Sequence, residues 1–171
     1  MWNLLFICTL LINCHLTVWP DINTNDVEYI KIYSLPRDLV KDHAITSKDK
    51  LIEWNKMGDN ASIMCRDTSI RSVDDINKFV SCVNSLKRAR GRCSIDIRTL
   101  AVLHLHSGEE INLCFGAFFG TTINGIPVKD NPTLFNFLTD KIYSPHENDP
   151  YYWAGKIMRV IIDTPPEEEC Q

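Results

Sequence analysis

Apolar residues recur along the chain at two spacings, one typical of β-strands and one typical of α-helices. Residues 28–34 (EYIKIYS) are rich in β-branched and aromatic side chains and precede Pro36, which predicts a strand that ends in a turn. Ser47 then offers an N-cap for a short helix that Gly58 ends. The apolar positions of this helix are Leu51, Trp54 and Met57.

The helix that the sequence specifies best follows Ser72. Ser72 and Asp75 have the spacing of a capping box, and Gly91 is a stop signal. Lys87, Arg88 and Arg90 would then occupy the last turn, where they favour the helix dipole. The apolar positions at helical spacing are Ile76, Phe79, Val80, Val83 and Leu86.

Two hairpins are predicted in the middle of the chain. Extended segments at residues 94–106 and 110–119 flank Ser107 and Gly108. A second hairpin is indicated by Asn124 and Gly125, because Asn-Gly readily takes the positive φ angles of a type I′ turn. This region therefore predicts an antiparallel meander.

A further helix and a final strand complete the prediction. Asn131 and Pro132 supply a cap and a first-turn proline, and residues 156–163 are apolar enough for a buried strand. The apolar stripe of the helix comprises Leu134, Phe135, Leu138 and Ile142. The predicted fold class is α+β: an antiparallel sheet, a meander with hairpins, packed by about three helices and stabilised by disulfides.

The N-terminus resembles a secretory signal peptide. Residues 1–14 carry no charged side chain, and residues 4–12 (LLFICTLLI) are apolar except for Thr9. This run is shorter than the roughly 20 residues needed to span a bilayer, but it matches a signal-peptide core. We expect residues 1–14 to be the signal, residues 15–163 to form one secreted domain, and residues 164–171 to be an acidic tail. No later segment predicts a membrane span.

Charge limits the classes of partner. The 18 basic and 22 acidic residues give a formal net charge of −4, which argues against a general nucleic-acid binder. Only a local basic patch could attract a polyanion.

The cysteines are widely spaced and contain no C-x-x-C, which favours a disulfide framework over a zinc or redox site. We favour Cys82 with Cys93 and Cys65 with Cys114. Cys170 would then be unpaired or would link two chains in a homodimer. Cleavage before Cys14 would instead leave an even number of cysteines.

The cations Lys87, Arg88, Arg90 and Arg92 lie within six residues. Their X-B-B-X-B-X pattern is associated with heparin-like glycosaminoglycans, whose sulfates pair with clustered cations. The alternatives are the preference of helix C-termini for cations and a dibasic processing site at Lys87 and Arg88.

His104 and His106 form an i, i+2 pair on a predicted strand, which directs both imidazoles to one face, and Glu110 follows. The string resembles the first half of the cupin metal motif, although Arg98 stands where that motif has glycine. The alternative is the polar face of a half-exposed hairpin.

Two further features suit an extracellular protein. Asn60 begins a valid N-glycosylation sequon (NAS). Tyr151, Tyr152 and Trp153 lie in a predicted loop, where they could anchor a protein partner or cover the edge of the core.

We favour a secreted, non-enzymatic binding protein or effector that contacts an extracellular protein, with glycosaminoglycan assistance from the basic cluster and without a cofactor. One alternative is a carrier of a small apolar ligand. It is motivated by Phe115, Phe118, Phe119, Phe135 and Phe137. The other is a secreted metal-dependent enzyme that uses His104, His106 and Glu110.

Overall fold

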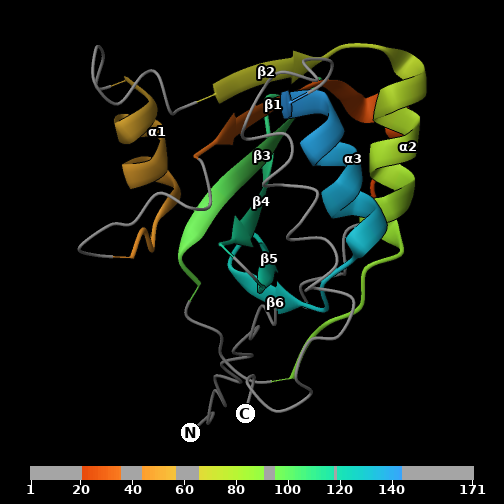
Figure 1. Cartoon of the computed structure of the whole chain (residues 1–171). Helices are drawn as coiled ribbons and strands as arrows, with labels where there is room; N and C mark the ends of the chain where they lie inside the picture. The colour runs from red at the N-terminus through yellow and green to blue at the C-terminus, as the bar shows by residue number, and fades with distance from the viewer. Residues whose placement is uncertain (1–20, 36–43, 57–65, 91–94, 118, 144–171) are drawn as a thin grey trace, which may run out of the picture.

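The computed structural model (Figure 1) describes residues 21–35, 44–56, 66–90, 95–117 and 119–143. Within them, six antiparallel strands form one sheet in the order β2-β1-β3-β4-β5-β6. Their bounds are β1 Val27–Ser34, β2 Arg66–Ile70, β3 Ile97–Leu105, β4 Glu110–Gly116, β5 Thr121–Ile123 and β6 Ile126–Val128. The helices are α1 Lys48–Lys56, α2 Val73–Asn84 and α3 Pro132–Tyr143, after a short 3-10 helix, Thr24–Asp26.

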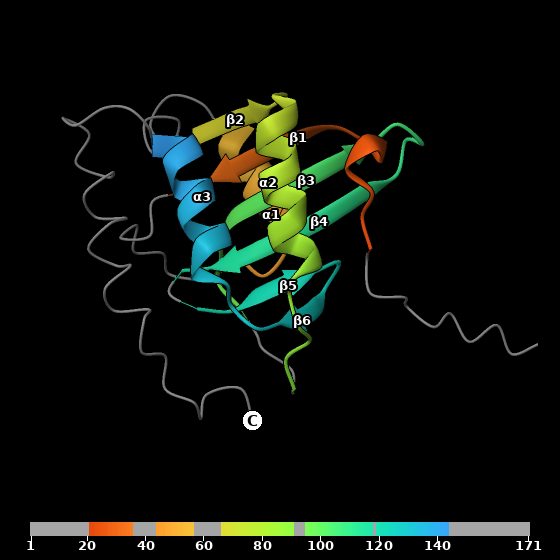
Figure 2. The same ribbon diagram turned by 90° about the vertical axis from the view of Figure 1, so that its right-hand side faces the viewer.

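The helices divide between the two faces of the sheet. Figures 1 and 2 show α2 and α3 side by side over one face and α1 alone over the other. A large apolar cluster fills the α2/α3 side around Phe79, which is fully buried. A smaller cluster around Leu51 and Leu100 lies under α1. The predicted α+β class, with an antiparallel sheet and about three helices, is confirmed.

The turns behave as their sequences predict. β3 and β4 form a hairpin closed by Ser107 and Gly108, and Gly108 has a φ of 86°. Asn124 and Gly125 have φ angles of 48° and 79°, as a type I′ turn between β5 and β6 requires.

Two of the predicted helix caps form. The Ser47 hydroxyl accepts the amide hydrogen of Lys50 at the start of α1. The Asn131 side chain accepts the amide hydrogen of Leu134 at 3.1 Å, with Pro132 as the first residue of α3. Both caps satisfy amide groups that the first turn of a helix leaves without a partner.

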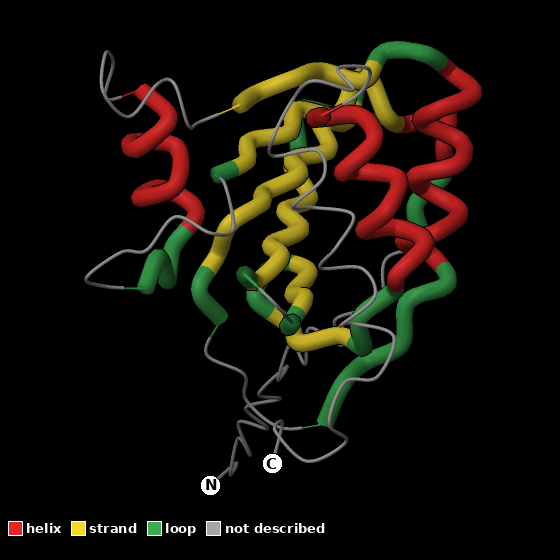
Figure 3. The backbone as a smooth tube through the Cα atoms, in the orientation of Figure 1, coloured by secondary structure: helices red, strands yellow, loops and turns green. Residues whose placement is uncertain are grey.

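Helix α2 differs from its prediction at both ends. Ser72 is the N-cap residue, but its side chain makes no capping hydrogen bond, so the predicted capping box is wrong. The helix ends at Asn84, and no basic residue lies in its last turn. A loop follows the helix (Figure 3). Lys87 and Arg88 belong to it, because the chain there hydrogen-bonds to β6 rather than to the preceding turn.

Strand β2 was not predicted. Its sequence, RDTSI, contains one apolar residue, and exposed and partly buried positions alternate along it. β2 lies at the edge of the sheet, where one row of backbone groups has no strand partner among the described residues. Polar edge strands of this kind carry a weak sequence signal because few of their side chains enter the core.

Among the residues that the structure describes, Cys82 and Cys114 are free cysteines. They lie on opposite faces of the sheet, Cys82 beside the α2/α3 cluster and Cys114 in the α1 cluster. Their predicted partners, Cys93 and Cys65, lie outside the described residues. The expected disulfide stabilisation is therefore not shown, and both pairings stay predictions.

No helix among the described residues is long and apolar enough to cross a membrane. The predicted signal peptide (1–14), final strand (156–163) and acidic tail (164–171) lie outside the described residues.

Candidate functional site

A short extended segment brings the basic cluster to the β6 edge of the sheet. The amide of Ala89 donates to the carbonyl of Pro127 at 3.0 Å, and the amide of Lys129 donates to the carbonyl of Lys87 at 2.8 Å. Arg88 forms the antiparallel bridge with Val128 between these two bonds. The path of this segment past β6 is visible in Figure 2. We call the exposed cations Lys87, Arg88, Arg90 and Lys129 the basic edge.

This pairing places Lys87 directly opposite Lys129. Opposed side chains in an antiparallel pair have Cβ atoms about 5 Å apart, and like charges at that separation destabilise the pair. Within the described part of the chain, neither Lys87 nor Lys129 makes an ion pair. The one acid adjacent in sequence, Asp130, accepts from the Gly120 amide at 2.8 Å and the Thr121 hydroxyl at 2.5 Å. Within the described residues no acid offsets the repulsion between these two lysines, and a bound anion would relieve it.

The sequence identified only part of the basic edge. Arg92 lies outside the described residues, and Lys129 was missed because it is forty residues or so from the cluster along the chain. The signal that could have found it is its position just after β6, the second strand of the Asn-Gly hairpin, where another segment can pair with the chain. The helix-dipole explanation for Lys87, Arg88 and Arg90 is wrong, since α2 ends before them.

The histidine pair does not form the hypothesised metal set. Among the described residues, no three His, Cys, Asp or Glu side chains gather to hold a metal ion. His104 stacks on the ring of Tyr29 with centroids 4.3 Å apart, and its Nδ1 lies 3.4 Å from Glu110 Oε1. His106 follows the end of β3, is exposed and anchors its backbone amide to Asp26. His104 and Glu110 therefore meet, but His106 does not join them.

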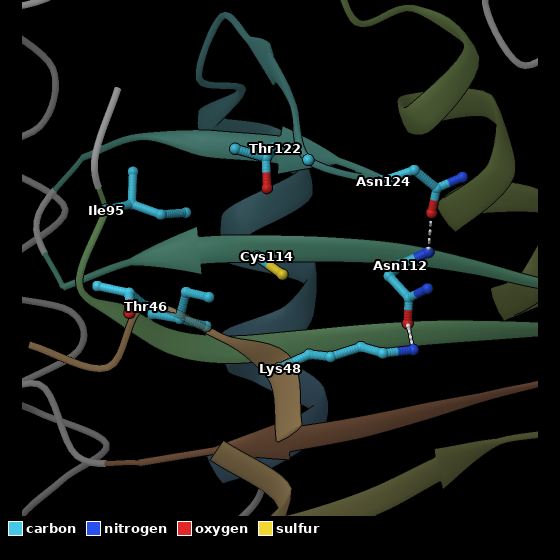
Figure 4. A pocket seen from close by; sticks show the side chains of 9 residues that line it. Thr46, Lys48, Ile95, Asn112, Cys114, Thr122 and Asn124 are labelled. Carbon is cyan, nitrogen blue, oxygen red and sulfur yellow. Dashed lines mark hydrogen bonds between the residues drawn. The ribbon is translucent and has the colours of Figure 1, made fainter. Parts of the chain in front are cut away.

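A pocket of about 510 Å³ lies on the α1 face of the sheet (Figure 4). It exists because α1 contacts β1 and β3, while no described helix covers β4 to β6 on this face (Figure 1). Its buried part is formed by Ile95, Ile97, Cys114 and Thr122. Its rim is formed by Thr46, Lys48, Asn112, Asn124 and Gly125.

Polar side chains of the rim contact one another or the backbone of a neighbouring strand. The Lys48 amine donates to Asn112 Oδ1 at 3.4 Å and lies 3.8 Å from Glu110 Oε2. The backbone amide of Asn112 donates to Asn124 Oδ1 at 2.8 Å, which fixes the second amide side chain at the rim. Lys48 has three donor hydrogens, so this geometry leaves it able to bind a further acceptor.

Cys114 in the pocket is not set up as a nucleophile. Burial raises the pKa of its thiol, and this outweighs the hydrogen bond from Thr122 and the nearby Lys48 charge, which both lower it. Thiolates are the reactive form, and a raised pKa keeps the thiol protonated at neutral pH.

The phenylalanines that suggested a carrier do not line this pocket. Phe115 and Phe135 pack on each other in the α2/α3 core, with ring centroids 6.4 Å apart, and Phe137 contacts Phe79 in the same way. Phe119 is 47% exposed, and Phe118 lies outside the described residues. Asn60, Tyr151, Tyr152, Trp153 and Cys170 also lie outside them.

Comparison with known protein families, with curated protein sequences and with solved structures finds no significant match for this chain.

Proposed function

We propose that this protein is a secreted, non-enzymatic binding protein that engages a sulfated glycosaminoglycan through the basic edge. The observation that carries the proposal is the opposed pair Lys87 and Lys129, held by backbone hydrogen bonds and without an ion-pair partner in the described part of the chain. A backbone fixed by a sheet presents cations at a set spacing, so less conformational entropy is lost when an anion binds.

Several properties favour a sulfated polysaccharide over other polyanions. The net charge of −4 restricts contact with any polyanion to this local edge, which argues against a general nucleic-acid binder. Sulfate groups accept hydrogen bonds from lysine and arginine, and charge-assisted bonds of this kind are stronger than neutral ones. A linear chain of sulfates can follow the extended segment from Lys87 to Arg90.

The test is binding to heparin by the full-length secreted protein. The double variant Lys87→Gln, Lys129→Gln removes the opposed pair and leaves Arg88, which has other contacts, in place. At about 1 kcal/mol for each lost surface contact, we expect roughly 10- to 30-fold weaker binding at physiological salt.

The matched control is Lys50→Gln, Lys78→Gln. Both lysines are exposed, neither belongs to the basic edge, and the change in net charge is the same. Equal weakening by both double variants would show that only net charge matters and would overturn the proposal. So would elution of the wild-type protein from a heparin column below physiological salt.

The further proposal that this protein also contacts an extracellular protein is based on the sequence alone. Tyr151, Tyr152 and Trp153 remain its proposed contact residues, and Cys170 the proposed link in a disulfide-bonded homodimer.

A further inference from the structure

We propose that the pocket between α1 and strands β4 and β5 binds a small carboxylate with an apolar body. The proposal is independent of the basic edge, because no residue of that edge lines the pocket. A pocket of about 510 Å³ falls in the size range of small-molecule sites, and its combination of apolar walls with a few polar groups is typical of them.

The polar groups of the pocket select a single negative charge. Among the described residues that line the pocket, Lys48 is the only charged one, and the other polar side chains include amides and hydroxyls. Figure 4 shows the Lys48 side chain extending from α1 along the rim towards Asn112. The Lys48 amine and the Asn112 side-chain amide can both donate to one carboxylate, which makes this end of the pocket an anion-binding position.

Glu110 argues against a more highly charged ligand. Its Oε2 lies 3.8 Å from the Lys48 amine, so it already offsets part of the lysine charge. Its other oxygen faces His104 at 3.4 Å, which keeps the carboxylate in place when a ligand approaches. A phosphate dianion would face this carboxylate without a second cation in the lining, whereas a carboxylate monoanion needs only Lys48.

The other end of the pocket is apolar. Ile95 and Ile97 are 8% and 4% exposed and form its wall, and Ile95 lies at the end away from Asn112 in Figure 4. Cys114 and Thr122 lie between the two ends, and each has one small polar atom, so this part of the pocket adds no charge. A ligand with a charged head and an apolar tail therefore matches the pocket along its length.

The experiment measures binding of octanoate, octanol and octyl phosphate to the full-length protein by isothermal titration calorimetry. We expect octanoate to bind about tenfold more tightly than octanol, which has the same tail without the charge, and more tightly than octyl phosphate. Absence of octanoate binding, or octanol or octyl phosphate binding at least as tightly, would overturn the proposal.

Two variants locate the site. Lys48→Met keeps the aliphatic stem and removes the charge, so it should weaken octanoate about tenfold and leave octanol unchanged. The control, Lys50→Met, changes an exposed lysine of the same helix that does not line the pocket, and it should leave both affinities unchanged. Octanoate should also slow alkylation of Cys114 relative to Cys82. Equal octanoate affinity in wild type and Lys48→Met, or unaltered Cys114 alkylation, would place the ligand elsewhere.

Discussion

The ion pair between the buried Arg98 and the partly buried Asp96 should contribute strongly to stability. The Arg98 side chain is 6% exposed, and its Nε and Nη2 donate to Asp96 Oδ2 at 2.9 and 2.5 Å. Asp96 Oδ1 accepts the Ile45 amide at 2.8 Å, and the Ile97 amide donates to the Ile45 carbonyl at 2.7 Å. One carboxylate thus neutralises a buried cation and holds the segment that leads into α1.

Asp96→Ala removes the three hydrogen bonds that the Asp96 carboxylate accepts, two from Arg98 and one from Ile45. It leaves the buried Arg98 guanidinium without this partner. Loss of one member of a buried pair costs about 3–5 kcal/mol. Arg98 has contacts besides Asp96, which places the expected loss near the lower value, about 3 kcal/mol. For a chain of this size that corresponds to a fall in melting temperature of about 6–12 °C.

Urea unfolding monitored by circular dichroism measures the loss, and two further variants test its cause. Asp96→Asn keeps an acceptor for Ile45 and should lose less than Asp96→Ala. Adding Arg98→Met to Asp96→Ala removes the buried charge that has lost its Asp96 partner and should restore part of the stability. A loss below about 1 kcal/mol for Asp96→Ala, or a double variant no more stable than Asp96→Ala, would refute the reasoning.

Further predictions concern the thiol in the pocket and two glycines. Cys114 is buried and free among the described residues, so iodoacetamide should modify it slowly in the folded protein and rapidly in urea without reductant; a requirement for reductant would contradict the free thiol and favour the predicted pair with Cys65. Burial raises its pKa, so its contribution to stability is complete below the unfolded-state pKa and is lost as the pH rises through the folded-state pKa. In urea unfolding, the free energy of unfolding should therefore fall more steeply with rising alkaline pH in wild type than in Cys114→Ala. Equal slopes in the two proteins would contradict this. Gly125→Ala meets no neighbouring atom and should cost only the backbone strain of a φ of 79°, about 1–2 kcal/mol. Gly120→Ala adds a clash with Ile95 and should cost more; an equal or smaller loss would contradict that packing.

The sequence predicted the elements that combine a periodic apolar pattern with a local stop or turn signal. Helix α3 has both, through Asn131, Pro132 and the buried Leu134 and Leu138, and the β5–β6 hairpin is specified by Asn124 and Gly125. Strand β2 lacked such a pattern, because an edge strand needs only one buried side chain here, Ile70. The end of α2 was misplaced because the segment after Asn84 pairs with β6, and pairing between distant segments leaves no local signal.

The candidate sites depend even more on distant contacts. Lys87 and Lys129 come together only through pairing at the β6 edge, and Lys48 meets Asn112 only because α1 packs on the face of the sheet that carries the Asn112 side chain of β4, far along the chain. Single-sequence reasoning could identify the cations between Lys87 and Arg92 as a cluster, since they are adjacent. It could not predict which residues line the pocket, because these residues share no sequence motif.

The two proposed anion sites share a sheet face, and their separation predicts how far they influence each other. Thr122 of the pocket pairs with Pro127, and Lys129 is two residues further on, so strand alternation puts Lys87 and Lys129 on the pocket side. The distance from β4 to the segment that pairs with β6, residues 87–89, is three strand spacings, or about 14 Å. This exceeds the Debye length of about 8 Å at physiological salt, whereas at 0.01 M salt that length reaches about 30 Å. A saturating heparin oligosaccharide should therefore change octanoate affinity by less than about twofold at physiological salt and weaken it measurably at 0.01 M. Strong competition at physiological salt would mean that both anions bind the same cations, and the assignment of two separate sites would be wrong.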